Sequence, residues 1–266
     1  MDIIYQLPFP DDVCSKIFFY TCKSPHTGLG VNLFKIKSNF RDKQLWNLYR
    51  NIPKMDKDVI NLDEDTFGVN YMSNIPNILL YLDCFCNLTE IWLHYTNADG
   101  NIEHLKSLRN LTMIGLSGTG VYGDIEPLES LHNLTQIYLN ETGVSGNIAH
   151  LESLPKLTWI DLHNTGVSGN IEHLKSLSNI IKIDFSNTSV YGDIAHLKSL
   201  LNLRNIYLSN TGVNGNIEHL KSLLNLTNIY LDDTDVYGDK VHLRKILCKY
   251  KLAYINFENT DNSGNV

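Results

Sequence analysis

The sequence predicts an α/β solenoid, a fold in which one short structural unit is repeated and stacked along an axis. The main observation is a pair of apolar residues with one residue between them, as in Ile137 and Leu139. The second member of this pair recurs every 23 residues from Leu93 to Leu231, and a further pair, Ile255 and Phe257, follows after 26. The residues that follow each pair also repeat, in the order threonine, valine, glycine and isoleucine. Self-similarity at a fixed period indicates a repeat architecture in which each coil buries its apolar face against its neighbours.

Residues 1–58 precede the regular period and predict a helical N-terminal cap. Segment 11–20 places its apolar residues on one helical face, and Asp11 is a suitable N-cap. We expect further helical elements over 24–37 and 42–50. A cap of this kind would cover the hydrophobic edge of the first coil.

Residues 59–266 predict the solenoid itself, with regular coils from about residue 88. Val59-Ile60-Asn61-Leu62 is expected to be the strand of a degenerate first coil, and 74–81 its return path. Near the other end, segment 240–250 has extra residues and helical apolar spacing, so we expect a true helix there. The last predicted strand is 254–257.

One regular unit, residues 137–157, illustrates the expected coil. Ile137-Tyr-Leu139 alternates and predicts a short strand with both apolar residues facing one way. Gly146 permits a bend or a close approach of the chain. Apolar residues then recur at every third position, which suits a 3₁₀ return path: Ile148, Leu151, Leu154 and Leu157. Each coil gives about seven apolar side chains to the core, each worth roughly 1.5–3 kcal/mol when fully buried.

This unit resembles the leucine-rich-repeat family. The family pattern Leu-x-x-Leu-x-Leu-x-x-Asn-x-Leu is matched by Leu-Thr-Gln-Ile-Tyr-Leu-Asn-Glu-Thr-Gly-Val at 134–144. Gly-Asn-Ile at 146–148 resembles the plant-specific subclass, although threonine replaces the family's asparagine and the subclass proline is missing. Over about 88–266 the resemblance implies a right-handed solenoid with a curved parallel sheet on its concave face and a 3₁₀ or irregular convex face.

The position of the family's asparagine is a threonine in every coil. These threonines form a predicted structural ladder: Thr96, Thr119, Thr142, Thr165, Thr188, Thr211, Thr234 and Thr260. The resemblance implies that they turn inward and hydrogen-bond the backbone of neighbouring coils. The alternative is an exposed threonine array, as in some ice-binding solenoids.

The N-terminal segment also weakly resembles an F-box, the helical module that docks onto a ubiquitin-ligase adaptor. Leu7-Pro8, Asp12-Val13, Lys16-Ile17-Phe18 and Phe40-Arg41…Leu45-Trp46 carry this resemblance. The segment 22–28 fits the F-box pattern poorly, and the expected tryptophan-containing stretch is absent. The resemblance implies a substrate receptor of a ubiquitin ligase as an alternative to a plain cap.

Composition favours a globular protein in a reducing compartment. Hydrophobic residues make up 43% of the chain, charged residues 19%, and the net charge is −7, which argues against nucleic acid or acidic membranes as partners. No basic leader followed by an apolar core begins the chain, so we expect no signal peptide and a cytoplasmic location. The five cysteines are scattered: Cys14, Cys22, Cys84, Cys86 and Cys248. Glycosylation sequons would instead suit a secreted recognition protein: Asn87, Asn110, Asn133, Asn140, Asn187 and Asn225.

The exposed residues of the predicted sheet are aromatic and acidic, and tyrosine and tryptophan are favoured interface anchors. We therefore expect a protein or peptide partner, with basic character, to bind this face. The predicted contact residues are Trp92, His94, Tyr138, Trp159, Asp161, His163, Asp184, Tyr207, Tyr230 and Asp232.

No catalytic constellation, cofactor motif or metal-binding motif is recognisable, so we predict a protein that is not an enzyme. A histidine recurs at the start of each return path except where Pro127 interrupts: His104, His150, His173, His196, His219 and His242. Zinc would need three or four convergent ligands, which this column does not supply in every coil. We expect a repeated capping or stacking position there.

Overall fold

The computed structural model describes residues 59–61, 79, 82, 88–248, 254–256 and 260. The predicted helical cap over 1–58, including its F-box-like part, lies outside these residues. So does most of the predicted return path over 74–81, of which Leu79 is described and is buried.

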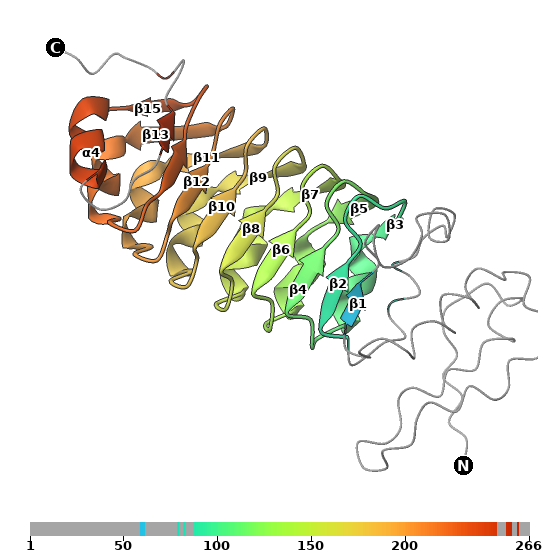
Figure 1. Ribbon diagram of the computed structural model, residues 1–266. Coiled ribbons are helices and arrows are strands. Elements are labelled where there is room, and N and C mark those ends of the chain that lie inside the picture. Colours follow the sequence, from blue (N-terminus) through green and yellow to red (C-terminus); the bar gives the residue numbers. More distant parts are fainter. Residues whose placement is uncertain are drawn as a thin grey trace, which may run out of the picture.

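The chain forms a stack of coils with two parallel sheets running along it (Figure 1). We call the nine-stranded one the main sheet. Its strands, in spatial order, are β1 (Val59–Asn61), β2 (Glu90–Trp92), β4 (Met113–Gly115), β6 (Gln136–Tyr138), β8 (Trp159–Asp161), β10 (Lys182–Asp184), β12 (Asn205–Tyr207), β14 (Asn228–Tyr230) and β16 (Tyr254–Asn256). The predicted first strand, at residues 59–61, is confirmed, because Val59 pairs with Glu90 of β2.

The second sheet has seven strands, and we call it the side sheet. It consists of β3 (Asp99–Asn101), β5 (Gly120–Asp124), β7 (Gly143–Asn147), β9 (Gly166–Asn170), β11 (Ser189–Asp193), β13 (Gly212–Asn216) and β15 (Asp235–Tyr237). We did not predict these strands, because the sequence pattern there indicated only an inward turn. Their parallel pairing places backbone hydrogen bonds where irregular structure was expected.

Short 3₁₀ helices close each coil opposite the main sheet, as the three-residue apolar spacing predicted. They are η2 (Ile102–Ser107), η3 (Glu126–Ser130), η4 (Ile148–Ser153), η5 (Ile171–Ser176), η6 (Ile194–Ser199) and η7 (Ile217–Ser222). In the last interval an α-helix, α4 (Lys240–Leu247), takes their place, also as predicted. None of the helices in the described ranges is long and apolar enough to span a lipid bilayer.

The core is one continuous apolar column between the sheets and the 3₁₀ helices. In coil 137–157, for example, Ile137, Leu139, Val144, Ile148 and Leu151 are all fully buried. Equivalent residues stack directly, since Ile137 pairs with Ile114 on one side and Ile160 on the other. Each coil therefore continues the packing surface of the coil before it, which a single coil could not bury alone.

The threonine ladder differs from what the resemblance implied. The hydroxyls of Thr96, Thr119, Thr142 and the equivalent threonines donate to the carbonyl three residues earlier in their own coil, at 2.6–2.8 Å. They close the turns that follow main-sheet strands β2 to β14, where the next-to-last residue of the turn has a positive φ, for example 58° at Glu141. Each of these hydroxyls is engaged inside its own coil, so the ladder is not an outward-facing ice-binding array.

Other side chains make the hydrogen bonds between coils. Thr135 Oγ1 donates to the carbonyl of Thr112 at 2.9 Å, and Thr158 repeats this bond to Thr135. Asn133 Nδ2 donates to the carbonyl of Arg109 at 3.0 Å, and Asn225 Nδ2 to that of Leu201 at 2.9 Å. These two asparagines begin predicted sequons, and their repetition follows from this structural position.

A glycine recurs at the same position of successive side-sheet strands, and a larger residue would not fit there. At Gly146, φ is +110°, and a Cβ atom would lie 2.3 Å from Oδ1 of Asp124 in the preceding coil. That oxygen cannot withdraw freely, because it accepts the backbone N–H of Glu126 at 2.8 Å at the start of η3. Backbone strain and a steric clash therefore both exclude a side chain here.

We predict that Gly146→Ala lowers the free energy of unfolding by about 1–3 kcal/mol, the usual range for a residue forced into such a conformation. Urea denaturation followed by circular dichroism measures the change. Ser145→Ala, at the exposed neighbouring position in β7, is the matched control and should change stability little. Equal stability of the two variants would contradict the steric interpretation.

Candidate functional site

The exposed face of the main sheet contains all ten residues predicted to contact a partner. Each main-sheet strand from β2 to β16 has a buried central isoleucine flanked by two outward positions, as in β12, where Ile206 is buried between Asn205 and Tyr207. Six predicted residues are the last residues of strands: Trp92, Tyr138, Asp161, Asp184, Tyr207 and Tyr230. Trp159 begins β8, and His94, His163 and Asp232 lie two residues beyond strand ends.

An aromatic row occupies the N-terminal half of this face. The ring centroids of Trp92 and His94 are 5.6 Å apart, those of His94 and Tyr138 5.7 Å, and those of Tyr138 and Trp159 5.9 Å. His94 fits between its neighbours because residue 115 is glycine, since a Cβ there would lie 2.5 Å from His94 Nε2. The first half of the face is thus a linked set of rings across β2, β4, β6 and β8.

A tyrosine stack occupies the C-terminal half. Tyr207 and Tyr230 have ring centroids 5.0 Å apart, and Tyr230 and Tyr254 4.9 Å, both in stacked geometry. These rings come from β12, β14 and β16. Tyr254 was not among the predicted contacts; its side chain is 47% exposed at the C-terminal end of the stack.

Lys182, at the start of β10, joins the two aromatic groups and was not among the predicted site residues. Its ammonium lies 4.9 Å from the Trp159 ring centroid and 5.1 Å from that of Tyr207, so both rings make cation–π contacts with it. It also lies 2.9 Å from Asp161 Oδ2. Aligning the columns of the repeat places Lys182 beside Trp159, which pairs with it in the sheet, so this signal was present in the sequence.

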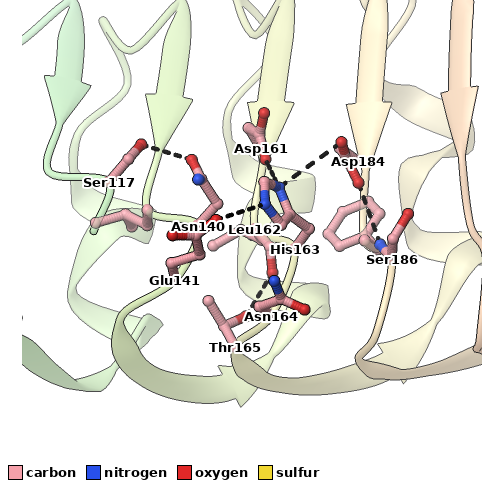
Figure 2. A network of polar contacts seen from close by, with 12 residues as sticks. Ser117, Asn140, Glu141, Asp161, Leu162, His163, Asn164, Thr165, Asp184 and Ser186 are labelled. Carbon is pink, nitrogen blue, oxygen red and sulfur yellow. Dashed lines mark hydrogen bonds and ion pairs between the residues drawn. The ribbon is translucent and has the colours of Figure 1, made fainter. Parts of the chain in front are cut away.

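A polar cluster lies between the aromatic groups and consists of Glu141, Asp161, His163 and Asp184 (Figure 2). His163 Nδ1 lies 2.7 Å from Asp161 Oδ1 and 3.8 Å from Asp184 Oδ2, and its Nε2 lies 3.4 Å from Glu141 Oε1. Both aspartates are buried, at 7% and 9% exposure, and they face each other across paired strands. The cluster holds several charges in a partly dehydrated site.

Burial changes the acid–base properties of several residues on this face. The pKa of Asp184 is raised, first by burial and then by the negative charge of Asp161, while the Ser186 N–H and Lys182 act in the opposite direction. Burial lowers the pKa of His94 and raises the pKa values of Tyr138 and Tyr207. His94 is therefore favoured as a neutral aromatic ring, and both tyrosines are favoured as neutral phenols.

Hydrogen bonds between coils and within strands hold further side chains of the face in place. Ser117 Oγ donates to Asn140 Oδ1 at 2.5 Å, and Ser209 Oγ donates to Asp232 Oδ2 at 3.0 Å. Tyr138 donates its hydroxyl to Gln136 at 2.9 Å, and the indole N–H of Trp92 donates to Glu90 at 3.0 Å. The surface is therefore ordered before any partner binds.

The histidine column lies on the 3₁₀ side and pairs with carboxylates instead of stacking. His150 Nδ1 lies 3.0 Å from Glu129, and His173 Nδ1 lies 3.0 Å from Glu152, in each case a glutamate of the preceding coil. His242 on α4 lies 3.1 Å from Glu218. The expectation of a capping or stacking position did not include these glutamates.

Comparisons with solved structures identify the fold. The chain resembles the plant peptide hormone receptor RGFR1 in complex with RGF2, with a TM-score of 0.62 and 24% identity over 70% of this chain and 30% of that one. It resembles the leucine-rich-repeat ectodomain of the Arabidopsis receptor kinase HAESA, in complex with an IDA peptide hormone, with a TM-score of 0.60 and 20% identity over 73% and 33%. For an internalin, InlF, from Listeria monocytogenes the TM-score is 0.50, at 14% identity over 69% and 65%.

The chain is a leucine-rich-repeat solenoid, with a parallel sheet on one face and 3₁₀ helices on the opposite one. It spans about a third of the two receptor structures. No protein-family model matches the sequence, and no curated protein matches it.

The raised pKa of Asp184 predicts a pH-dependent effect of Asp184→Asn. Because the folded-state pKa lies above the ordinary value of 3.8, ionisation of Asp184 destabilises the fold. This penalty is absent below pH 3.8 and grows as the pH rises toward the folded-state pKa. The stability of Asp184→Asn relative to the wild type should therefore increase between about pH 4 and pH 7.

Thermal denaturation of both proteins across this range measures the difference. Asp235→Asn, at an exposed position on the side sheet, serves as the control, and its difference from the wild type should stay nearly constant. A difference for Asp184→Asn that declines as the pH rises would show that the carboxylate is stabilised in its charged form, contrary to our interpretation.

Proposed function

We propose that this protein is a non-enzymatic binding module that recognises a protein or an extended peptide through the exposed face of its main sheet. The observation that carries the proposal is the aromatic surface that crosses the sheet from Trp92 to Tyr254, with Lys182 and the polar cluster at its centre. Large rings presented by successive strands offer apolar area at low entropic cost.

Preorganisation supports this proposal. Ring contacts and the hydrogen bonds of Ser117, Ser209 and Tyr138 fix the side chains before binding. A partner would therefore lose little free energy to ordering this surface.

Charge favours a basic partner. The chain has a net charge of −7, and carboxylates on or beside this face outnumber its cations, with Glu141 47% exposed at the edge of the polar cluster. Complementary charge raises association rates and selects against acidic partners. We therefore propose that the peptide or protein surface bound here is basic.

The structural relatives provide a precedent for this mode of binding. RGFR1 and HAESA are both described in complexes with peptide ligands. The scattered cysteines and the exposed thiol of Cys248 suit a reducing compartment, and we accordingly propose cytoplasmic partners.

The test is affinity capture from native cell lysate, followed by direct binding measurements with each purified candidate partner. We predict that the triple variant Tyr138→Ala, Trp159→Ala, Tyr207→Ala weakens binding of the true partner by about a hundredfold or more, as expected for interface anchors. Circular dichroism and thermal denaturation must first establish that the variant is folded.

Three exposed tyrosines of the side sheet provide a matched control. The triple variant Tyr122→Ala, Tyr191→Ala, Tyr237→Ala removes rings that are 48%, 53% and 44% exposed on the other sheet, and it should leave affinity unchanged. If this control loses binding while the main-sheet variant retains it, the proposed face is wrong. Capture of ubiquitin-ligase adaptors by residues 7–46 alone would assign the binding function to the F-box-like segment instead.

A further inference from the structure

We propose that Asp161, His163 and Asp184 form a binding site for a divalent transition-metal ion of the zinc type. The repeat does not require these residue types together, since no other coil has both an aspartate at this strand position and a histidine two residues later. The proposal concerns the polar cluster itself and holds whatever partner the main sheet binds.

The geometry brings three ligand atoms to one point. One atom from each of the three side chains lies within 4.8 Å of the other two. Asp161 and Asp184 are paired residues of β8 and β10, and His163 lies two residues after the end of β8. Zinc bound to nitrogen and oxygen ligands at about 2.0–2.2 Å holds those atoms roughly 3–3.5 Å apart. The distances from His163 Nδ1 to Asp161 Oδ1, 2.7 Å, and to Asp184 Oδ2, 3.8 Å, lie on either side of that range.

Asp184 Oδ2 is the least closely bound carboxylate oxygen of the cluster. Asp184 is 9% exposed, and its Oδ1 accepts the Ser186 N–H at 3.2 Å. Its Oδ2 is directed into the cluster (Figure 2), where it makes two long ion pairs, to Lys182 Nζ at 3.7 Å and to His163 Nδ1 at 3.8 Å. Both distances exceed hydrogen-bond reach, so this oxygen remains available as a ligand for a cation.

His163 is flanked by carboxylates on both ring nitrogens. Its Nδ1 lies 2.7 Å from Asp161 Oδ1 and its Nε2 lies 3.4 Å from Glu141 Oε1. A neutral imidazole has a single N–H and can donate to only one of them. Without a metal, Nδ1–H donates to Asp161 Oδ1. In the other tautomer, Nε2–H faces Glu141 and the lone pair of Nδ1 is available to a cation. Metal-bound histidines are commonly oriented in this way by a carboxylate on their other nitrogen.

The ammonium of Lys182 is a simpler counter-charge for the carboxylates of the cluster than a metal ion, but it neutralises only part of their negative charge. Its ammonium bonds Asp161 Oδ2 at 2.9 Å and leaves Asp161 Oδ1 and Asp184 Oδ2 directed at His163. Three carboxylates, those of Glu141, Asp161 and Asp184, thus surround one lysine and one histidine. A divalent ion would balance this charge, while repulsion from Lys182 would weaken its binding.

The ligand set defines the class of ion. One imidazole and two carboxylates suit Zn²⁺, and also Co²⁺ and Mn²⁺, better than soft ions that prefer sulfur. Three protein ligands leave at least one coordination position for water. The site lies on the exposed sheet face, so that position is accessible to solvent and to a bound partner.

The test uses the purified full-length chain and the metal alone. Isothermal titration calorimetry with Zn²⁺ and the visible absorption of bound Co²⁺ should both report one ion per chain at micromolar concentrations. Asp184→Asn and His163→Gln should each weaken binding by at least about tenfold, and Glu141→Gln by about tenfold, as is usual for a residue that orients a ligand. Lys182→Met should strengthen binding, because it removes the competing charge.

His150→Gln is the matched control, because it removes a histidine–glutamate pair with a similar 3.0 Å separation on the 3₁₀ side of the solenoid. It should leave the affinity unchanged. Circular dichroism of the metal-free variants establishes that each is folded. Absence of stoichiometric binding to the wild type, or binding that survives Asp184→Asn but is lost in His150→Gln, would overturn the proposal. Partner binding by the aromatic rows is measured separately, so either proposal can fail alone.

Discussion

The stacking of each coil on the next in a fixed register is the constraint on which the rest of the structure depends. Ile137 pairs with Ile160, and Thr135 donates to a carbonyl 23 residues earlier. Because the register is fixed, residues at the same repeat position stack in a column. They therefore have similar burial and make similar hydrogen bonds in each coil. The fixed register also explains the glycines with positive φ, because Gly146 must admit Asp124 of the preceding coil. Where the period lengthens, α4 takes up the additional residues, and Ile255 still pairs with Ile229.

The same register determines what this protein can recognise. The interior positions are nearly the same in every coil, so the coils differ mainly in the outward residues of the main sheet. There, neighbouring coils bring residues that are distant in sequence into contact. Trp159, Lys182 and Tyr207 illustrate this, since three successive strands place an ammonium between two rings. Aspartates paired across β8 and β10 are likewise forced together by register and must be neutralised by their surroundings. The aromatic surface and the polar cluster are thus two consequences of one stacking rule.

The sequence predicted the features that depend on local pattern. It did not predict features whose interaction partners come from another coil. Alternation at Ile137 and Leu139 predicted the main sheet, and three-residue spacing from Ile148 predicted the 3₁₀ helices. The side sheet was missed because its short strands, such as Gly143–Asn147, are glycine-rich and polar and are stabilised by pairing with neighbouring coils. We missed three further features for the same reason: the role of Lys182, the glutamate partners of the histidine column and the convergence of Asp161 with Asp184. The ten predicted contact residues do share one face, because outward alternation alone fixes that property.

Site-specific photocrosslinking tests the central claim, that the main sheet is the recognition surface, most directly. A photoreactive phenylalanine analogue would replace Tyr230 on the main sheet or Tyr191 on the side sheet, one at a time, in otherwise unchanged protein. After irradiation with the purified partner, mass spectrometry identifies the crosslinked residues on both molecules. The account predicts a defined crosslink from position 230, at a basic segment of the partner, and none from position 191. Crosslinks from position 191 with none from position 230 would contradict it.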